Sequence, residues 1–209
     1  MEPVGEKHRK ARPGKRSEQK DATHQRIYQA ARQLFEERGY FETTSGDIAK
    51  AAGVSTGSVF AHFGSKAKIM TAVMIEISSR RIERLQSAKW QSRTCLGRLH
   101  EIAALLWQLN NEETDLMRAC FSYTWVWDKE EENRFNEYIA ERGRLIHAIL
   151  AGADDWDEFC ADFDVDFGFR LFQCYHENLV RESAHVPPDE LYPRLLRAVD
   201  FIFARAAPE

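Results

Sequence analysis

Hydroxyl and imidazole side chains gather on one short segment, Thr56–Phe63, which reads TGSVFAHF. In a helix, Val59 and Phe63 are four residues apart and share a face that can pack on a core. The opposite face then carries Thr56, Gly57, Ser58 and His62. Small hydroxyl side chains at a helix N-terminus can donate to phosphates and base edges, and the positive end of the helix favours an anion there. These residue types at this spacing indicate contact with a nucleic acid.

Capping signals predict the helices that position this segment. Thr44 and Asp47 form a Thr-x-x-acid start signal, and Gly53 supplies the positive φ that ends the helix. Ser55 is placed to cap the next helix, Gly64 ends it, and Ser65 caps a third helix. Two helices joined by a short turn around a glycine are typical of a helix-turn-helix, whose second helix enters the major groove of DNA.

The stretch from Arg26 to Ile69 resembles the DNA-binding domain of the TetR family of one-component transcriptional regulators. The matching residues are Arg26, Ile27, Ala30, Ala31, Leu34, Phe35, Gly39, Tyr40, Thr43, Thr44, Ile48, Ala49, Ala52, Gly53, Val54, Ser55, Gly57, Phe60, His62, Phe63, Ser65 and Lys66. The family usually has Tyr in place of Phe60, so a hydroxyl that contacts a phosphate is missing here. Ala67 replaces a common Glu.

Three further positions complete the predicted DNA contacts. Thr43 and Thr44 are expected at the exposed start of the first helix of the motif. Lys66 lies in the first turn of the following helix, where the helix dipole disfavours a cation, and a nearby phosphate would explain it. The full predicted set of DNA-binding residues is Thr43, Thr44, Thr56, Gly57, Ser58, Phe60, His62 and Lys66.

The net charge of −4 is divided unevenly along the chain. Residues 1–70 hold 13 Lys/Arg against 8 Asp/Glu, a net of +5, and residues 71–209 hold 16 against 25, a net of −9. A basic head and an acidic body would orient the head toward DNA. Residues 1–20, rich in Lys, Arg, Pro and Gly, are predicted to be a disordered arm that lies on phosphates or in the minor groove, or else a solubilising tail.

Helical periodicity runs through the rest of the chain, and no segment alternates with a period of two. We therefore expect an all-α fold, with an N-terminal three-helix DNA-binding domain at 21–68 and a larger helical ligand-binding and dimerisation domain at 69–209. The predicted helices are 21–38, 66–90, 94–110, 112–127, 130–150, 165–182 and 189–206. No segment has the length of apolar sequence that a membrane span or secretory signal needs, and the widely spaced cysteines are expected to be buried thiols, so a cytoplasmic protein is predicted.

The last two predicted helices carry apolar residues on more than one face. One stripe suffices to dock a surface helix, so the second indicates either a symmetry mate or full burial within one monomer. The family resemblance implies a homodimer, and two-fold symmetry would make the operator palindromic. The predicted interface residues are Phe172, Leu179, Leu195, Val199 and Ile202.

The middle helices hold an unusual number of aromatic residues. The family resemblance implies a pocket there for a small apolar or aromatic effector, while an aromatic core without a ligand is the other interpretation. The predicted pocket residues are Trp107, Met117, Phe121, Trp125 and Tyr138.

Enzymatic chemistry finds no support in the sequence. The pairs His100-Glu101 and His176-Glu177 are adjacent, so their members point in different directions and neither pair is assigned to a metal or to catalysis. The acidic run from Asp154 to Asp166 lacks the glycine of a Ca²⁺ loop and is interpreted as a solvated segment. No catalytic residue, metal site or cofactor is predicted.

Two hypotheses for regulation remain open. The chain is expected to be a dimeric repressor that an effector releases from its operator by moving the long helix that begins at Lys66. Alternatively, it is a DNA-binding regulator without a small-molecule effector, controlled by a protein partner or by its abundance.

Overall fold

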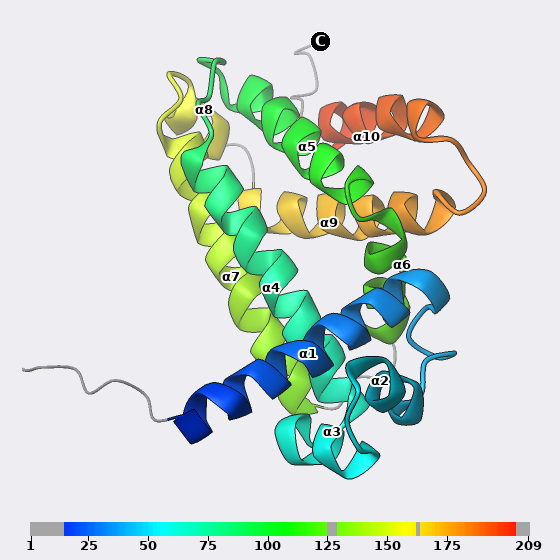
Figure 1. The fold of residues 1–209 in the computed structure, drawn as a ribbon. Helices are drawn as coiled ribbons and strands as arrows, with labels where there is room; N and C mark the ends of the chain where they lie inside the picture. Colours follow the sequence, from blue (N-terminus) through cyan, green and yellow to red (C-terminus); the bar gives the residue numbers. More distant parts are fainter. Residues whose placement is uncertain (1–14, 125–128, 162–163, 204–209) are drawn as a thin grey trace, which may run out of the picture.

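A computed structural model describes residues 15–124, 129–161 and 164–203. Within these ranges the chain forms helices and connecting turns and no strand, which confirms the all-α prediction. The helices are α1 (Lys15–Arg38), α2 (Ser45–Ala52), α3 (Thr56–Phe63), α4 (Lys66–Ser87), α5 (Cys95–Asn111), α6 (Thr114–Tyr123), α7 (Lys129–Ala151), α8 (Trp156–Ala161), α9 (Val165–Glu182) and α10 (Pro188–Phe203). In Figure 1, α1, α2 and α3 form one end of the molecule and α5, α8 and α10 the other, with α4 and α7 running side by side between them.

Capping interactions delimit the short helices at the N-terminal end. The Thr44 hydroxyl accepts from Asp47 N, and the Asp47 carboxylate accepts from Thr44 N, so α2 begins with a complete capping box. Gly53 ends α2 with a φ of 65°, a left-handed conformation that glycine adopts without steric cost. The Ser55 hydroxyl then accepts from Ser58 N and starts α3. The predicted bounds of α3 agree with the structure.

The N-terminal core does not stop where the long helix begins. Ile27, Phe35, Ile48, Val59 and Ile69 are fully buried together, and the same apolar cluster continues into α6 and reaches α9. At this junction the Tyr40 and Tyr123 ring centroids are 4.3 Å apart. The N-terminal helices are therefore packed directly on α4 and α6, and a displacement of either helix acts on them.

A second apolar cluster fills the other end of the molecule. It joins α5, α9 and α10 with the C-terminal half of α7, the end of α4 and the short helix α8. Leu179 of α9 and Leu191 and Leu195 of α10 are fully buried in it. Because consecutive turns of α9 and α10 contribute to this cluster, one face of each helix is already occupied within the protomer.

Several element boundaries differ from the predicted ones. α1 begins at Lys15, so residues 15–20 are helical rather than part of a disordered arm, because good helix formers fill them and no Pro or Gly interrupts them. α4 ends at Ser87 instead of Trp90. The remainder of the predicted arm, the end of the predicted helix 112–127 and the last residues of 189–206 lie outside the described residues.

The cysteines and the acidic run also depart in part from expectation. Cys95 and Cys120 are buried and Cys160 is partly buried, but Cys174 is exposed on the outer face of α9. In the acidic run, the Asp155 carboxylate accepts from Cys95 N at 2.7 Å, so part of the run caps α5. Asp154 pairs with Arg93. The described acidic, histidine and cysteine side chains form no cluster that could hold a metal ion.

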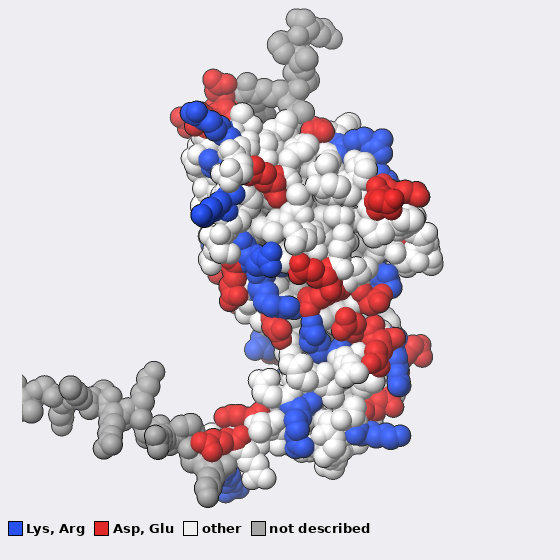
Figure 2. All heavy atoms as spheres, turned by 45° about the horizontal axis from the view of Figure 1, so that its top comes forward, with Lys and Arg blue, Asp and Glu red and all other residues white. Residues whose placement is uncertain are grey.

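The division of the sequence into a basic and an acidic part does not produce separate basic and acidic areas on the visible surface (Figure 2). On the face shown in Figure 2, Lys/Arg and Asp/Glu side chains are scattered among uncharged ones, and both signs occur at each end of the molecule. No helix in the described ranges has both the length and the apolar character needed to cross a bilayer.

Candidate nucleic-acid interface and effector pocket

The helix α3 presents to solvent the face predicted to carry Thr56, Gly57, Ser58 and His62. Thr56 and Gly57 are exposed and Ser58 is partly exposed, while Val59 is fully buried beneath them. A Cβ added to Gly57 would approach only the Ser55 hydroxyl, at 3.8 Å, so the outer side of this turn is open. Phe60 is 49% exposed on the same helix. The first turn of α3 can therefore approach a phosphate or a base edge closely.

His62 lies between this surface and the first helix. Its ring centroid is 5.9 Å from that of His24 in α1, and the His24 ring stacks on Phe63 at 4.1 Å. Burial and the neighbouring His62 lower the pKa of His24. The outer edge of α3 is thus supported by α1.

Thr43 does not face outward, and its assignment to DNA is wrong. It is only 1% exposed, and its hydroxyl lies 2.8 Å from Gly39 O and 3.2 Å from Leu34 O, to which it donates. These carbonyl groups at the end of α1 need a donor, and Thr43 supplies it. Thr44 is exposed, but its hydroxyl is engaged by Asp47 in the capping box.

Lys66 is also engaged inside the protein, so no phosphate is needed to explain a cation in the first turn of α4. Its ammonium group donates to Tyr40 O at 2.8 Å and to Thr43 O at 2.7 Å, and it lies 4.1 Å from the centroid of the Tyr40 ring. Burial lowers the pKa of Lys66. The lysine ties the start of α4 to the loop before α2.

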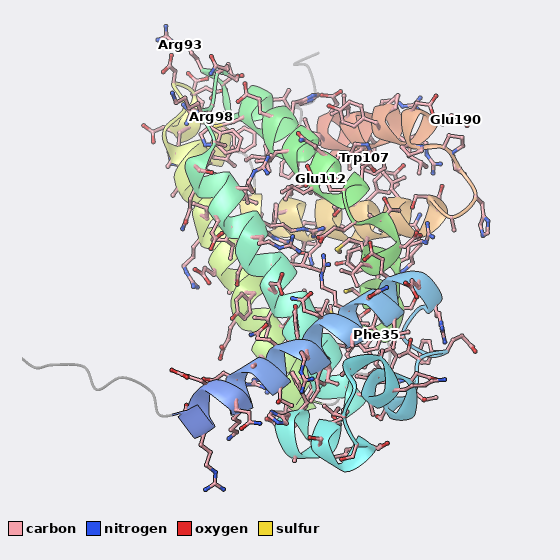
Figure 3. All side chains as sticks on the ribbon, in the orientation of Figure 1. Phe35, Arg93, Arg98, Trp107, Glu112 and Glu190 are labelled. Carbon is pink, nitrogen blue, oxygen red and sulfur yellow. The ribbon has the colours of Figure 1, made fainter. Side chains whose placement is uncertain are left out.

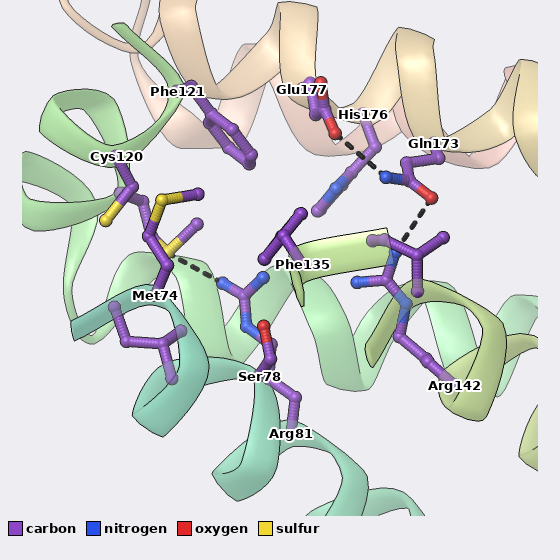
Figure 4. A pocket seen from close by; sticks show the side chains of 13 residues that line it. Met74, Ser78, Arg81, Cys120, Phe121, Phe135, Arg142, Gln173, His176 and Glu177 are labelled. Atoms are coloured by element: carbon purple, nitrogen blue, oxygen red, sulfur yellow. Dashed lines mark hydrogen bonds between the residues drawn. The ribbon is translucent and has the colours of Figure 1, made fainter. Parts of the chain in front are cut away.

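A pocket lies between α4, α6, α7 and α9. Its apolar lining comprises Met74, Ile77, Met117, Cys120, Phe121, Phe135 and Ile139, and its polar lining comprises Ser78, Arg81, Arg142, Gln173, His176 and Glu177. In Figure 4, Arg81 and His176 point toward this space from opposite sides. The cavity is about 20 Å³, which is room for about one water molecule. A larger molecule enters only if side chains or helices move.

Two of the predicted pocket residues, Met117 and Phe121, line this cavity. Trp107 does not line the cavity. It is buried in the second apolar cluster, where its ring stacks on Tyr192 with the centroids 6.2 Å apart (Figure 3). Tyr138 does not line it either, because α7 contributes Phe135, Ile139 and Arg142 to the lining. Trp125 lies outside the described residues.

The polar pocket residues were missed by the sequence analysis. Arg81 continues the apolar row formed by Ile77 and Leu85 at four-residue spacing, and an arginine in such a row is the signal that could have revealed it. His176 and Glu177 both line the pocket although they are adjacent. Burial, followed by the charges of Arg81 and Arg142, lowers the pKa of His176 to about 3, so its ring is neutral.

Four of the five predicted interface residues are not at the surface. Phe172, Leu179, Leu195 and Val199 are buried in the protomer's own core, because the predicted stripe is the one that α9 and α10 turn toward each other and toward α5. Only Ile202 retains exposure. The outer stripes form an apolar groove lined by Leu171, Tyr175, Arg194, Arg197, Ala198, Phe201 and Ile202.

The fold and the α3 surface define an all-α protein with an N-terminal helix-turn-helix. Residues 27–73 match the model of the bacterial regulatory proteins of the tetR family. Among characterised proteins, the HTH-type transcriptional regulator TtgR of Pseudomonas putida is 39% identical over 57 residues, which are 27% of this chain and 27% of TtgR. The matched part thus spans about a quarter of that relative's length.

Solved structures extend the likeness to the rest of the chain. Thermus thermophilus FadR, a TetR-family transcriptional repressor solved with lauroyl-CoA, is 25% identical with a TM-score of 0.67, covering 89% of this chain and 98% of its own. Bacillus subtilis FadR, solved with stearoyl-CoA, shares the fold at 18% identity and a TM-score of 0.67, covering 88% of this chain and 100% of its own. Residues 27–73 thus match the DNA-binding domain of TetR-family regulators, and the chain as a whole shares the fold of solved TetR-family proteins.

Proposed function

We propose that the chain is a cytoplasmic, homodimeric transcriptional repressor that binds a palindromic operator and is released from it by a small apolar or aromatic effector. Residues 21–68 act as the DNA-binding domain and residues 69–209 as the ligand-binding and dimerisation domain. The observation that carries this proposal is α3, whose exposed first turn presents Thr56, Gly57 and Ser58 while Val59 anchors it from below. The family match covers this same segment.

Dimerisation uses the outer faces of α9 and α10 rather than the buried stripes. Phe201 is 91% exposed and Leu171 is 45% exposed, and both line the apolar groove between the two helices. Large apolar side chains at such exposure favour association with a partner. Two-fold symmetry would put the two α3 helices on successive major-groove faces, about 34 Å apart or at a multiple of that distance, as a palindromic operator requires.

Release by an effector follows from the position of α4. This helix lines the pocket through Met74, Ile77 and Arg81, and its first turn is tied by Lys66 to the loop before α2. An effector that needs more than the present cavity displaces α4 or α7 and so acts on α1 to α3. Effector binding and DNA binding are then reciprocally coupled.

The small cavity equally favours the second hypothesis, a regulator without a small-molecule effector. A thermal-shift screen of apolar compounds, followed by a DNA-binding assay, discriminates the two. Compounds that raise the melting temperature and also release DNA support the effector-controlled repressor. A tightly bound operator that no stabilising compound releases favours control by a partner or by abundance.

Selection from random duplexes followed by gel-shift assays at low ionic strength tests DNA binding itself. We expect a palindromic consensus. Thr56→Ala and Ser58→Ala should each reduce discrimination between that consensus and random DNA, by about 1–3 kcal/mol if they contact base edges. Equal losses on both duplexes would make them backbone contacts. No retardation of any duplex would exclude the proposed function.

A further inference from the structure

The pocket holds two guanidinium groups that form no close ion pair with a carboxylate of the described residues. Arg81 of α4 is 7% exposed, and Arg142 enters from α7. Neither arginine takes part in any of the ion pairs among the described residues. Burial lowers the pKa of each arginine to about 10, so both remain charged at neutral pH. The charge of Glu177, another lining residue, offsets part of this effect at Arg142, but neither arginine forms a close ion pair with a carboxylate of the described residues.

Arg81 is held by neutral acceptors. Its Nη2 donates to Asn110 Oδ1 and lies 3.1 Å from Met117 Sδ. Because Asn110 Oδ1 accepts from Arg81, the amide nitrogen of Asn110 donates to Nε2 of the neutral His176 ring, at 2.6 Å. This chain of hydrogen bonds orients the Arg81 guanidinium without neutralising it.

Arg142 has fewer partners. Its Nη2 donates to Gln173 Oε1 at 2.8 Å, and its guanidinium lies 5.7 Å from the centroid of the Phe169 ring. Its Nε is buried and has no hydrogen-bond partner among the described residues. Glu177 is the acidic member of the lining, and it accepts from Gln173 Nε2 at 3.0 Å instead of pairing with Arg142. A buried donor without an acceptor is costly, so a ligand acceptor that reached Arg142 Nε would be stabilised there.

We propose that the effector of this pocket is an amphipathic carboxylate, whose anionic end binds between the guanidinium groups of Arg81 and Arg142 and whose apolar part packs against Met74, Phe121 and Phe135. This inference rests on the proposed function and names its effector class. The planar guanidinium fork matches a carboxylate, which can accept the free Arg142 Nε–H and so complete the site.

The shape of the pocket favours a carboxylate over a bulkier anion. The present cavity of about 20 Å³, lined by both the polar and the apolar residues, has room for little more than one small group. Apolar side chains surround the rest of the lining, so the remainder of the ligand displaces aromatic rings rather than water. That displacement pushes on α4 and α7, which is the motion that release from DNA requires.

Isothermal titration calorimetry with the full-length dimer, using matched pairs of compounds, tests the inference. The carboxylates dodecanoate, octanoate and phenylacetate are compared with dodecan-1-ol, octan-1-ol and 2-phenylethanol, and lauroyl-CoA is included as an anion whose charge is carried by phosphates. We expect at least one carboxylate to bind at least tenfold more tightly than its alcohol. Arg142→Met should remove that preference, Arg142→Lys should keep part of it, and Arg144→Gln, at an exposed arginine of the same helix, should leave it unchanged.

Three binding results would each overturn the inference: no carboxylate binds, every carboxylate binds only as tightly as its alcohol, or lauroyl-CoA alone binds. The melting temperature without ligand separates binding from folding. Because Arg142→Met removes a charge whose burial is unfavourable and which forms no close ion pair, we expect the melting temperature to stay equal or to rise. A lower melting temperature with unchanged carboxylate affinity would make Arg142 a structural residue and would also overturn the inference. Carboxylate binding that depends on Arg142 but leaves DNA bound would support the inference and contradict the proposed release mechanism.

Discussion

Arg80 and Arg81 are consecutive residues of α4, and their guanidinium groups serve different parts of the molecule. Arg80 Nη2 lies 2.9 Å from both carboxylate oxygens of Glu113, which also pairs with Arg32 of α1. Arg81 instead lines the pocket and bonds to Asn110. Successive residues of a helix are about 100° apart, so one turn of α4 contacts both the pocket and the group that holds α1. A shift of α4 that accommodates a ligand therefore acts on the Glu113 cluster at once.

Glu113→Gln should weaken the attachment of α1 to the rest of the protein. The substitution leaves Arg32 and Arg80 without their shared carboxylate, and because both arginines are partly exposed we expect a loss of about 1 kcal/mol in the free energy of unfolding. Effector-induced release from DNA should also decrease, because α4 then pulls less directly on α1. Urea denaturation and gel-shift titrations with effector measure the two effects.

Glu112→Gln provides the matched control for Glu113→Gln. Glu112 is the adjacent, exposed residue, and its carboxylate accepts a hydrogen bond from Gln108 Nε2 at 3.3 Å. The Glu112→Gln variant should retain the wild-type coupling between effector binding and release from DNA. Equal coupling in both variants and the wild type would show that α4 communicates with α1 through apolar packing alone.

Lys66→Met should destabilise the fold without changing the salt dependence of DNA binding. The substitution leaves Tyr40 O and Thr43 O without their donor, at a cost of about 1–3 kcal/mol in the free energy of unfolding. A lysine that bound a phosphate would lower the slope of log K against log salt by about one when removed. Lys68→Met, at the exposed lysine in the same turn, is the comparison. A reduced slope for Lys66→Met would restore the phosphate interpretation.

Phe60→Tyr should strengthen DNA binding. Phe60 is 49% exposed on α3, so a hydroxyl at the ring edge adds a donor without disturbing the core. One hydrogen bond to a phosphate contributes about 1 kcal/mol, or roughly a fivefold gain in affinity, and the gain should be similar for operator and random duplexes. The melting temperature should be unchanged. Unaltered affinity on both duplexes would place this position away from the DNA backbone.

The two faces of α9 and α10 should respond differently to an introduced charge. Leu171→Asp and Phe201→Asp change exposed residues of the groove, so we expect folded monomers with poor operator affinity. Leu195→Asp places a carboxylate in the protomer core and should cost several kcal/mol in folding free energy, so the chain should be largely unfolded. Light scattering and circular dichroism distinguish these results. A stable dimer of the Leu171→Asp, Phe201→Asp double variant would move the interface elsewhere.

His176 should contribute a distinct acid sensitivity. Its pKa falls from 6.5 to about 3 on folding, so the folded state holds it neutral while the unfolded chain takes up a proton below pH 6.5. Its stabilising contribution is complete above pH 6.5 and declines by about 1.4 kcal/mol per pH unit as the pH falls toward 3. His176→Gln keeps an acceptor for Asn110. Between pH 6.5 and pH 5, the free energy of unfolding of this variant should fall by about 2 kcal/mol less than that of the wild type. Denaturation at both pH values measures this, with His185→Gln, at an exposed histidine, as the control.

Local signals in the sequence were sufficient for the N-terminal helices. The pair Thr44 and Asp47, the positive-φ glycines and Ser55 act over three or four residues, so their effect can be read without knowing what packs nearby. The same reasoning failed for Thr43 and Lys66, because their partners are carbonyl groups of the α1 terminus and the following loop. A side chain next to a helix start looks exposed in sequence whether or not a neighbouring segment covers it.

The sequence by itself determined the helical class of the protein, the bounds of α3 and the outward position of Thr56, Gly57 and Ser58, because caps and apolar periodicity are local properties of the chain. Only the tertiary structure decided which of two apolar stripes on α9 and α10 is core and which is surface. It alone also brought Arg81 and Arg142, 61 positions apart, to one pocket. Periodicity specifies that a helix has an apolar face, whereas the partner of that face depends on how the whole chain packs.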